Sequence, residues 1–162
     1  MANGKILTSI MDTLAVCSNI IESADSEVSI LSPPSLLVLS SKFGLRESTK
    51  MLILKEASVR CIADFSYQYI EELRELLDYG IDVRHAPQYR GIFMLVGDRR
   101  ESISSMSIDV ENLSIDAHLV ALWSDDSTYA EYLLSTFKIV WEQAIPGAQQ
   151  LEELLKDGPP NI

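Results

Sequence analysis

The residues of this chain with the clearest potential for chemistry lie between Gly80 and Asp98. Arg84 and His85 are adjacent in this stretch, and Asp98 ends the apolar run that follows them. An arginine binds anionic groups, and a histidine can bind a ligand or move a proton near neutral pH. One interpretation is a ligand-binding site without chemistry; the other is an enzyme acting on phosphate esters or another small molecule through Arg84, His85 and Asp98.

The elements around these residues place them at the end of a strand. Gly80 is a helix stop signal, Ile81 to Arg84 alternates apolar and charged residues as a half-buried strand does, and Ile92 to Val96 reads as a buried strand. Open α/β sheets bind ligands at the carboxyl ends of their strands, although exposed charges there also serve solubility alone. The predicted ligand-binding residues are therefore Arg84, His85, Tyr89, Arg90 and Asp98. Asp64 could line the same edge, but its Asp-Phe-Ser context favours a helix N-cap.

This stretch resembles the C-terminal half of a phospholipase-D-like domain, in which a "G-hydrophobic-x-V-R" strand leads into an HxKxxxxD catalytic motif. Counting back from Asp98 places the motif histidine at Gly91 and the motif lysine at Phe93. The resemblance implies a histidine nucleophile and a phosphate-neutralising lysine, and neither glycine nor phenylalanine can replace them. The motif is degenerate, and no catalytic residue is assigned.

A second segment, Ser135 to Pro146, resembles an "F-x-x-x-W-x-x-A-I-P" ending, with Phe137 and Trp141 as its aromatic residues. This ending is similar to that of archaeal sensor domains of the TrmB type, which occur with histidine kinases and transcriptional regulators. Such domains look like phospholipase-D-like folds whose catalytic residues are commonly lost. The two resemblances together imply a sensor domain over about Glu27 to Pro146.

Composition restricts the class of protein further. The 162 residues, 47% of them hydrophobic, suffice for one domain with one core. A net charge of −11 repels nucleic-acid phosphates and anionic membranes, so no direct nucleic-acid or membrane partner is expected. Cys17 and Cys61 are expected to be buried reduced thiols, and the two isolated histidines predict no metal site and no cofactor. Without a signal peptide or a long apolar run, a cytoplasmic location is expected.

The order of the predicted elements indicates an α/β fold. An amphipathic helix is expected over 4–23, followed by alternating strands and helices that predict a mixed, mainly parallel sheet flanked by helices, as in a phospholipase-D-like sandwich. Short turns after residue 83 predict antiparallel additions at 92–96, 101–106 and 115–123. Residues 1–146 would form one sensor-like domain, and 147–162 a connector helix and tail.

The prediction drawn from these observations is a non-catalytic signal-input domain that binds a small ligand or a protein partner. Inputs of this kind usually report through dimers, so a homodimer is expected, with Ile10, Leu14, Phe137 and Trp141 as interface candidates. The alternative is a phosphodiesterase-like or other small-molecule hydrolase with an altered active site.

Overall fold

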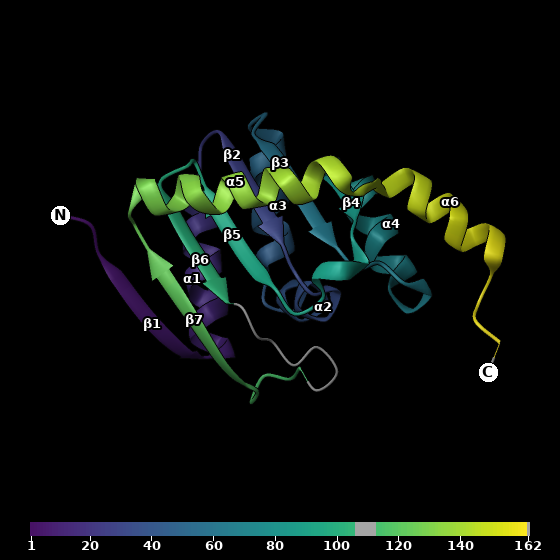
Figure 1. The fold of residues 1–162 in the computed structure, drawn as a ribbon, viewed down its shortest axis with the longest axis horizontal. Coiled ribbons are helices and arrows are strands. Elements are labelled where there is room, and N and C mark those ends of the chain that lie inside the picture. Colours follow the sequence, from purple (N-terminus) through teal and green to yellow (C-terminus); the bar gives the residue numbers. More distant parts are fainter. Residues whose placement is uncertain (106–112, 162) are drawn as a thin grey trace.

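A computed structural model describes residues 1–105 and 113–161. Within these residues one mixed sheet of eight strands runs in the order β1-β7-β6-β5-β2-β3-β4-β8 (Figure 1). The strands are β1 (Gly4–Ser9), β2 (Glu27–Leu31), β3 (Ser58–Ala63), β4 (Asp82–His85), β5 (Phe93–Gly97), β6 (Glu101–Ser105), β7 (His118–Ser124) and β8 (Ile145–Pro146).

Helices cover both faces of the sheet, so the molecule has three layers. The helices are α1 (Ile10–Ser23), α2 (Pro34–Ser41), α3 (Leu45–Leu54), α4 (Ile70–Asp78), α5 (Ser127–Gln143) and α6 (Gly147–Asp157). The first four lie on one face and α5 crosses the other, while α6 continues past the edge of the sheet next to α4 (Figure 1). We refer to the two faces as the α1–α4 face and the α5 face.

The sheet is mixed, but the expectation that it is mainly parallel is wrong. Among the strands that the structure describes, only β2, β3 and β4 are parallel neighbours. The strands β5, β6, β7 and β1 join one another and β2 by antiparallel pairing, as does β8 at the other edge. Parallel neighbours need a crossover helix, and after β4 the chain forms hairpins instead, since β5–β6 turns directly at residues 98–100.

The first predicted helix begins later than the sequence pattern indicates. Residues 4–9 form the edge strand β1, which pairs with β7 at the far end of the chain, and α1 begins at Ile10. Ser9 caps α1 by accepting a hydrogen bond from the Asp12 N–H at 3.1 Å. The spacing of Ile6 and Ile10 fits a helix locally, but pairing with β7 is a long-range contact that this spacing cannot reveal.

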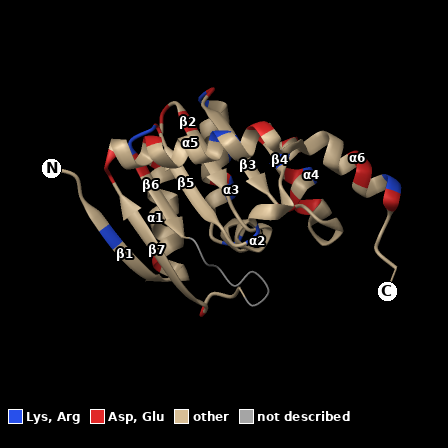
Figure 2. Cartoon of the chain, in the orientation of Figure 1, with Lys and Arg blue, Asp and Glu red and all other residues tan. Residues whose placement is uncertain are grey.

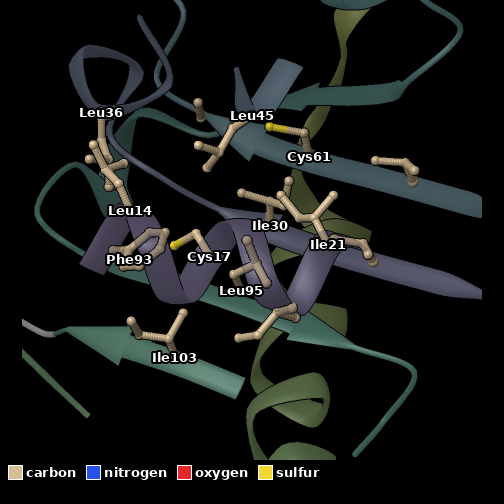
Figure 3. Close-up of a cluster of buried hydrophobic side chains, with 14 of the residues drawn as sticks. Leu14, Cys17, Ile21, Ile30, Leu36, Leu45, Cys61, Phe93, Leu95 and Ile103 are labelled. Atoms are coloured by element: carbon tan, nitrogen blue, oxygen red, sulfur yellow. The ribbon is translucent and has the colours of Figure 1, made fainter. Parts of the chain in front are cut away.

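The core lies between α1 and the sheet, where side chains of α1 meet those of β2, β3 and β5 (Figure 3). Ile10 and Leu14 belong to this core and are 0% and 3% exposed, and Phe137 is equally buried beneath α5. The side chains of these three residues are therefore buried inside the monomer and offer no surface to a second copy. Their assignment to a dimer interface is corrected. Trp141 is only partly buried, against the core cluster of the α5 face.

Charge is distributed unevenly over the helices. Acidic residues are prominent along α4 and α6 (Figure 2), in keeping with the net charge of −11. Among the residues that the structure describes, no helix is long and apolar enough to cross a membrane.

Candidate functional site

Asp64, His85 and Arg90 lie together where β3 and β4 end, and we call them the edge cluster. Asp64 follows β3 directly, His85 is the last residue of β4, and Arg90 follows the short 3-10 turn at Pro87–Tyr89. Asp64 Oδ2 pairs with Arg90 Nε at 2.9 Å, and its Oδ1 lies 3.9 Å from His85 Nδ1. The Arg90 side chain is 63% exposed, whereas those of Asp64 and His85 are 12% and 10% exposed.

The protonation state of His85 follows from its hydrogen bond. Its Nδ1 accepts the backbone N–H of Phe65 at 3.0 Å, which requires the neutral ring to carry its proton on Nε2. Burial lowers the pKa of His85, while the Asp64 carboxylate and the Ala63 backbone act in the opposite direction. A neutral imidazole at neutral pH can donate a hydrogen bond from Nε2, and it places no positive charge in this partly buried site.

Arg84 lies on the opposite face of the sheet from His85. Consecutive strand residues alternate faces, and Arg84 is paired with Ile62, which belongs to the core of the α5 face. There its guanidinium lies 4.3 Å from the centre of the Trp141 ring and donates to the Trp141 carbonyl at 2.7 Å. A cation near the carboxyl end of a helix stabilises it, so Arg84 holds α5 on the sheet.

Tyr89 and Asp98 are not brought into the edge cluster. Tyr89 packs against the core cluster of the α5 face. Asp98 follows β5, and because β5 runs antiparallel to β2, it lies beside Glu27 at the start of β2, at the opposite end of the strands from the edge cluster. Of the five predicted ligand-binding residues, the structure therefore joins only His85 and Arg90, through Asp64.

Asp98 organises the loop that enters β2. Its carboxylate accepts hydrogen bonds from the backbone N–H groups of Asp25, Ser26 and Glu27 and from the Ser26 hydroxyl, at 2.8 to 3.0 Å. Burial alone would raise the pKa of Asp98, but these donors outweigh it and hold the pKa well below its ordinary value. Asp98 and Arg99 both have positive φ, which turns the chain so that the carboxylate faces these donors.

Three further residues belong to these arrangements and were not among the predicted ligand-binding residues. Asp64 pairs with Arg90 instead of capping a helix; Ser66 and Tyr69 stand at the N-cap positions that follow. Gln150 of α6 donates to the Phe65 carbonyl at 2.7 Å. Arg60 lies 5.0 Å from the centre of the Phe137 ring on the α5 face. The sequence could have indicated this residue, because Arg60 alternates with the apolar residues of β3.

The two positions of the phospholipase-D motif carry no group that could do the motif's chemistry. Gly91 precedes β5, and Phe93, at the position of the motif lysine, is 3% exposed and packs into the core of the α1–α4 face. Among the described residues no group of three metal-ligating side chains is present. Position 93 therefore carries an apolar side chain where the motif has a phosphate-binding cation.

Solved structures with the same arrangement of strands and helices exist despite very low sequence identity. Nuc from Salmonella typhimurium, a phospholipase D family member, superimposes with a TM-score of 0.66 at 11% identity over 90% of this chain and 98% of its own. NucT from Helicobacter pylori gives 0.68 at 15% identity, over 90% of this chain and 99% of its own. The fold is phospholipase-D-like. No protein-family model matches the sequence, and no curated protein matches it significantly.

A third structural neighbour corrects one expectation. TrmBL2, described as an archaeal chromatin protein with a novel mode of DNA binding, superimposes with a TM-score of 0.70 at 13% identity over 88% of this chain. This chain spans about half of TrmBL2, 54% of its length. The expectation of no direct nucleic-acid contact, which was based on net charge, is overturned because a DNA-binding protein contains this fold. Net charge averages over the whole surface and does not describe a local binding face.

Proposed function

We propose that this chain is a non-catalytic signal-input domain, which binds a small ligand or a protein partner at the edge cluster and passes the change to α6. One observation carries the proposal. Phe65 donates its backbone N–H to His85 and accepts from Gln150 of α6 through its carbonyl, at 3.0 and 2.7 Å. A single residue thus connects the edge cluster to the last helix.

The connection is rigid on both sides of Phe65. The Phe65 side chain is 0% exposed, so its backbone cannot move without disturbing the core. α6 packs on α4 and β4, and its first residue, Gly147, touches the backbone of Val83. A ligand that draws Arg90 from Asp64, or that engages His85 Nε2, would change the hydrogen bonding of Phe65 and hence that of α6.

The absence of catalysis is supported by the residues at the degenerate motif. A lysine at position 93 would neutralise a phosphate, but Phe93 instead fills the core. The alternative, a hydrolase with an altered site, would use the His85 imidazole beside the Asp64 carboxylate. It lacks a lysine equivalent in the edge cluster, where Arg90 is already paired with Asp64.

The test of the connection is an NMR comparison of two conservative variants. Asp64→Asn should shift the backbone amide signals of residues 148–151 in α6, because the change at Arg90 and His85 reaches Gln150 through Phe65. Asp116→Asn, an exposed aspartate outside the cluster, is the matched control and should leave these signals in place. Unchanged α6 signals in Asp64→Asn would overturn the proposed route.

An assay with two histidine variants decides between a binding site and a hydrolase. We expect no hydrolysis of bis(4-nitrophenyl) phosphate by the wild type beyond that of His85→Ala, with His118→Ala as the control for a histidine outside the cluster. Hydrolysis lost in His85→Ala and kept in His118→Ala would establish the hydrolase instead.

A further inference from the structure

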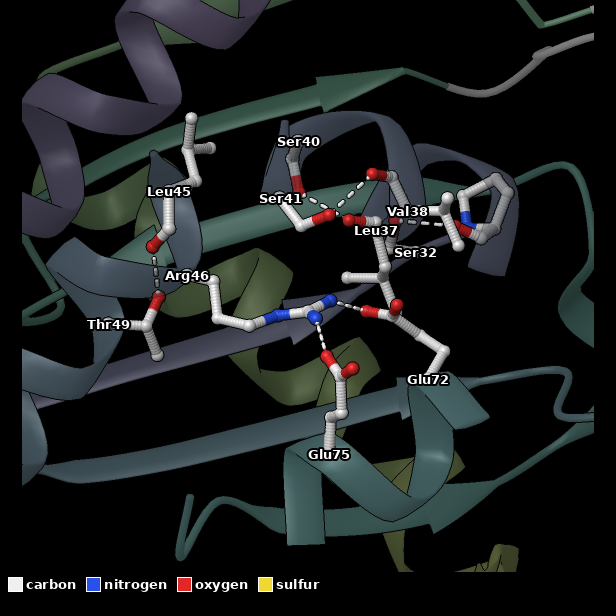
Figure 4. A network of polar contacts seen from close by, with 11 residues as sticks. Ser32, Leu37, Val38, Ser40, Ser41, Leu45, Arg46, Thr49, Glu72 and Glu75 are labelled. Carbon is white, nitrogen blue, oxygen red and sulfur yellow. Dashed lines mark hydrogen bonds and ion pairs between the residues drawn. The ribbon is translucent and has the colours of Figure 1, made fainter. Parts of the chain in front are cut away.

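Five of the seven arginines of this chain are paired with carboxylates. Arg46, for example, lies between the carboxylates of Glu72 and Glu75 (Figure 4). The other ion-paired arginines are Arg74, Arg90, Arg99 and Arg100. Arg60 of β3 and Arg84 of β4 are partly buried and form no ion pair within the described residues, although the sequence contains 24 acidic residues. These two cations therefore lack the counter-charge that the other arginines have.

Arg60 and Arg84 lie near each other on the α5 face, against one aromatic side chain. The strands β3 and β4 are parallel neighbours, and Arg84 pairs with Ile62, which is two positions after Arg60 and on the same face. The guanidinium carbons of Arg60 and Arg84 lie 5.7 and 4.3 Å from the centre of the Trp141 ring. Because the two side chains rise from neighbouring strands against the same ring, one small ligand can contact both.

Most N–H groups of the two guanidiniums have no acceptor in the protein. A guanidinium carries five N–H groups. Arg60 donates to the Ser29 hydroxyl at 3.0 Å. Arg84 donates to the Trp141 carbonyl at 2.7 Å. Within the described part of the chain, the buried polar side-chain atoms without a hydrogen bond are two serine hydroxyls, so the remaining guanidinium nitrogens reach solvent. Stacking on aromatic rings uses the flat face of a guanidinium and leaves its N–H edges open.

The charged residues next to this arginine pair do not cancel its charge. Asp82 is opposite Arg60 in the register of the strands. On α5, Lys138 lies one turn before Trp141, and Glu142 directly follows it. Asp82, Lys138 and Glu142 are exposed and form no ion pair among the residues that the structure describes. This part of the α5 face therefore has three positive and two negative groups, whereas the chain as a whole has a net charge of −11.

We propose that Arg60 and Arg84 form a binding site for the phosphate group of a small phosphate monoester or of free phosphate. The phosphate oxygens accept hydrogen bonds from the N–H edges of both guanidiniums, in the bidentate geometry that arginine forms with phosphate. A phosphate monoester carries a charge of about −1.5 to −2 at pH 7 and three acceptor oxygens, so it can neutralise both arginines at once. The site goes beyond the edge cluster, because Arg84 and His85 lie on opposite faces of the sheet.

Other ions complement the pair less well. A carboxylate has two oxygens and one charge, so it pairs side by side with one guanidinium and leaves the other without a partner. A phosphodiester also has one charge and only two terminal oxygens. A cation would meet only hydrogen-bond donors at the two guanidiniums. The pair therefore selects its ligand by negative charge and by the number of acceptor oxygens.

The experiment is an NMR titration of the full chain at pH 7 with sodium phosphate and with glycerol 3-phosphate, at an ionic strength held constant with NaCl. The indole N–H signal of Trp141 reports the site. The signal of Trp123, which donates to Glu101 at 2.7 Å and packs on the core of the α1–α4 face, is the internal control. We expect a saturable shift of the Trp141 signal alone, with a Kd of the order of 1 mM.

The comparison ligands are sodium acetate and sodium dimethyl phosphate. Tighter binding of glycerol 3-phosphate would identify the ligand as an organic monoester, and tighter binding of inorganic phosphate would identify it as the free ion; both support a phosphate site. The proposal is overturned if neither phosphate gives a saturable shift of the Trp141 signal, or if acetate or dimethyl phosphate binds equally well.

An arginine variant separates the site from general surface charge. Arg60→Lys keeps the positive charge but removes the planar N–H fork, so it should raise the Kd for glycerol 3-phosphate about five- to tenfold. Arg74→Lys makes the same change in α4, where Arg74 is paired with Glu71, and should change the Kd less than about twofold. A Kd in Arg60→Lys no higher than that in Arg74→Lys would overturn the site.

A second variant guards against a folding defect in Arg60→Lys, because it should tighten binding. Asp82→Asn removes a negative charge next to Arg60 and should lower the Kd about two- to threefold. Asp116→Asn removes an exposed charge elsewhere and should leave the Kd unchanged. Unchanged or weaker binding in Asp82→Asn would contradict the site. Failure of the route from the edge cluster to α6 would not affect these results, since the two sites share no residue.

Discussion

At the scale of single residues, Asp98 shows how a motif position can serve structure alone. It aligns with the aspartate of a catalytic motif, yet its carboxylate is used to bind three backbone N–H groups at the start of β2. The side chain is 8% exposed, so these donors would be difficult for water to satisfy in its absence. The residue fixes the end of the β5–β6 hairpin against the strand beside it.

Replacing Asp98 by Asn should lower the free energy of unfolding by about 2–3 kcal/mol, because charged hydrogen bonds become neutral or are lost. The pKa of Asp98 is lowered in the folded state, so its contribution is complete above the unfolded pKa of about 4 and declines progressively as the pH falls from there toward the much lower folded pKa. Urea unfolding of both proteins from pH 7 to pH 3 should show a difference that is constant down to about pH 5 and smaller, but not zero, at pH 3. Asp25→Asn, whose side chain makes none of these bonds, is the control; a difference that is no smaller at pH 3 than at pH 7 would contradict the assignment.

The grouping of candidate residues could have been predicted better from the sequence. Arg84 and His85 are neighbours on a strand, and the alternation of side chains already places them on opposite faces. The position of Asp98 could not be derived in this way, since it depends on β5 running antiparallel to β2. Asp64 was assigned to a cap because its local context fits one, and its pairing with Arg90 joins residues from two separate loops.

At the scale of elements, the sequence predicted strands well where a short local pattern marks them and failed where distant pairing decides. The strands β4, β5 and β6 appear close to their expected positions. β1 was taken as helix because nothing local reveals that β7 lies beside it. The prediction of mainly parallel strands was wrong for the same reason, because β5 lies between β2 and β6 through long-range contacts.

The contact of α6 with β4 depends on Gly147. A Cβ at this position would lie 2.7 Å from the Val83 carbonyl oxygen and 3.3 Å from a methyl group of Leu77. Gly147→Ala should therefore displace α6 and lower the free energy of unfolding by about 1–3 kcal/mol. Hydrogen exchange should show lost protection over residues 150–157. Gly4→Ala has only ordinary contacts, the nearest at 3.6 Å, and should change stability by less than about 0.5 kcal/mol; equal protection in both variants would contradict a close contact at Gly147.

At the scale of the whole molecule, negative charge is the dominant electrostatic feature. The net charge is −11, and acidic side chains are prominent on α4 and α6, which pack against each other (Figure 2). Self-repulsion of this kind destabilises a compact state. The ion pairs of Arg46, Arg90 and Arg99 offset only part of it, because the sequence contains 24 acidic and 13 basic residues. A partner that brings positive charge next to α4 and α6 would weaken this repulsion.

Salt should therefore stabilise this protein at neutral pH. Raising NaCl from about 10 mM to about 150 mM shortens the Debye length from about 30 Å to about 8 Å, which screens the repulsion among distant carboxylates more than the contacts within ion pairs. We expect the Tm at pH 7 to rise by about 2–5 °C, in line with about 1 kcal/mol for a chain of this size. Near pH 4.5, the isoelectric point, the net charge vanishes and the increase should disappear. Calorimetric scans at both pH values measure this, with KCl to confirm that the effect is one of ionic strength. A Tm that falls with salt at pH 7 would show that the local ion pairs outweigh the net repulsion.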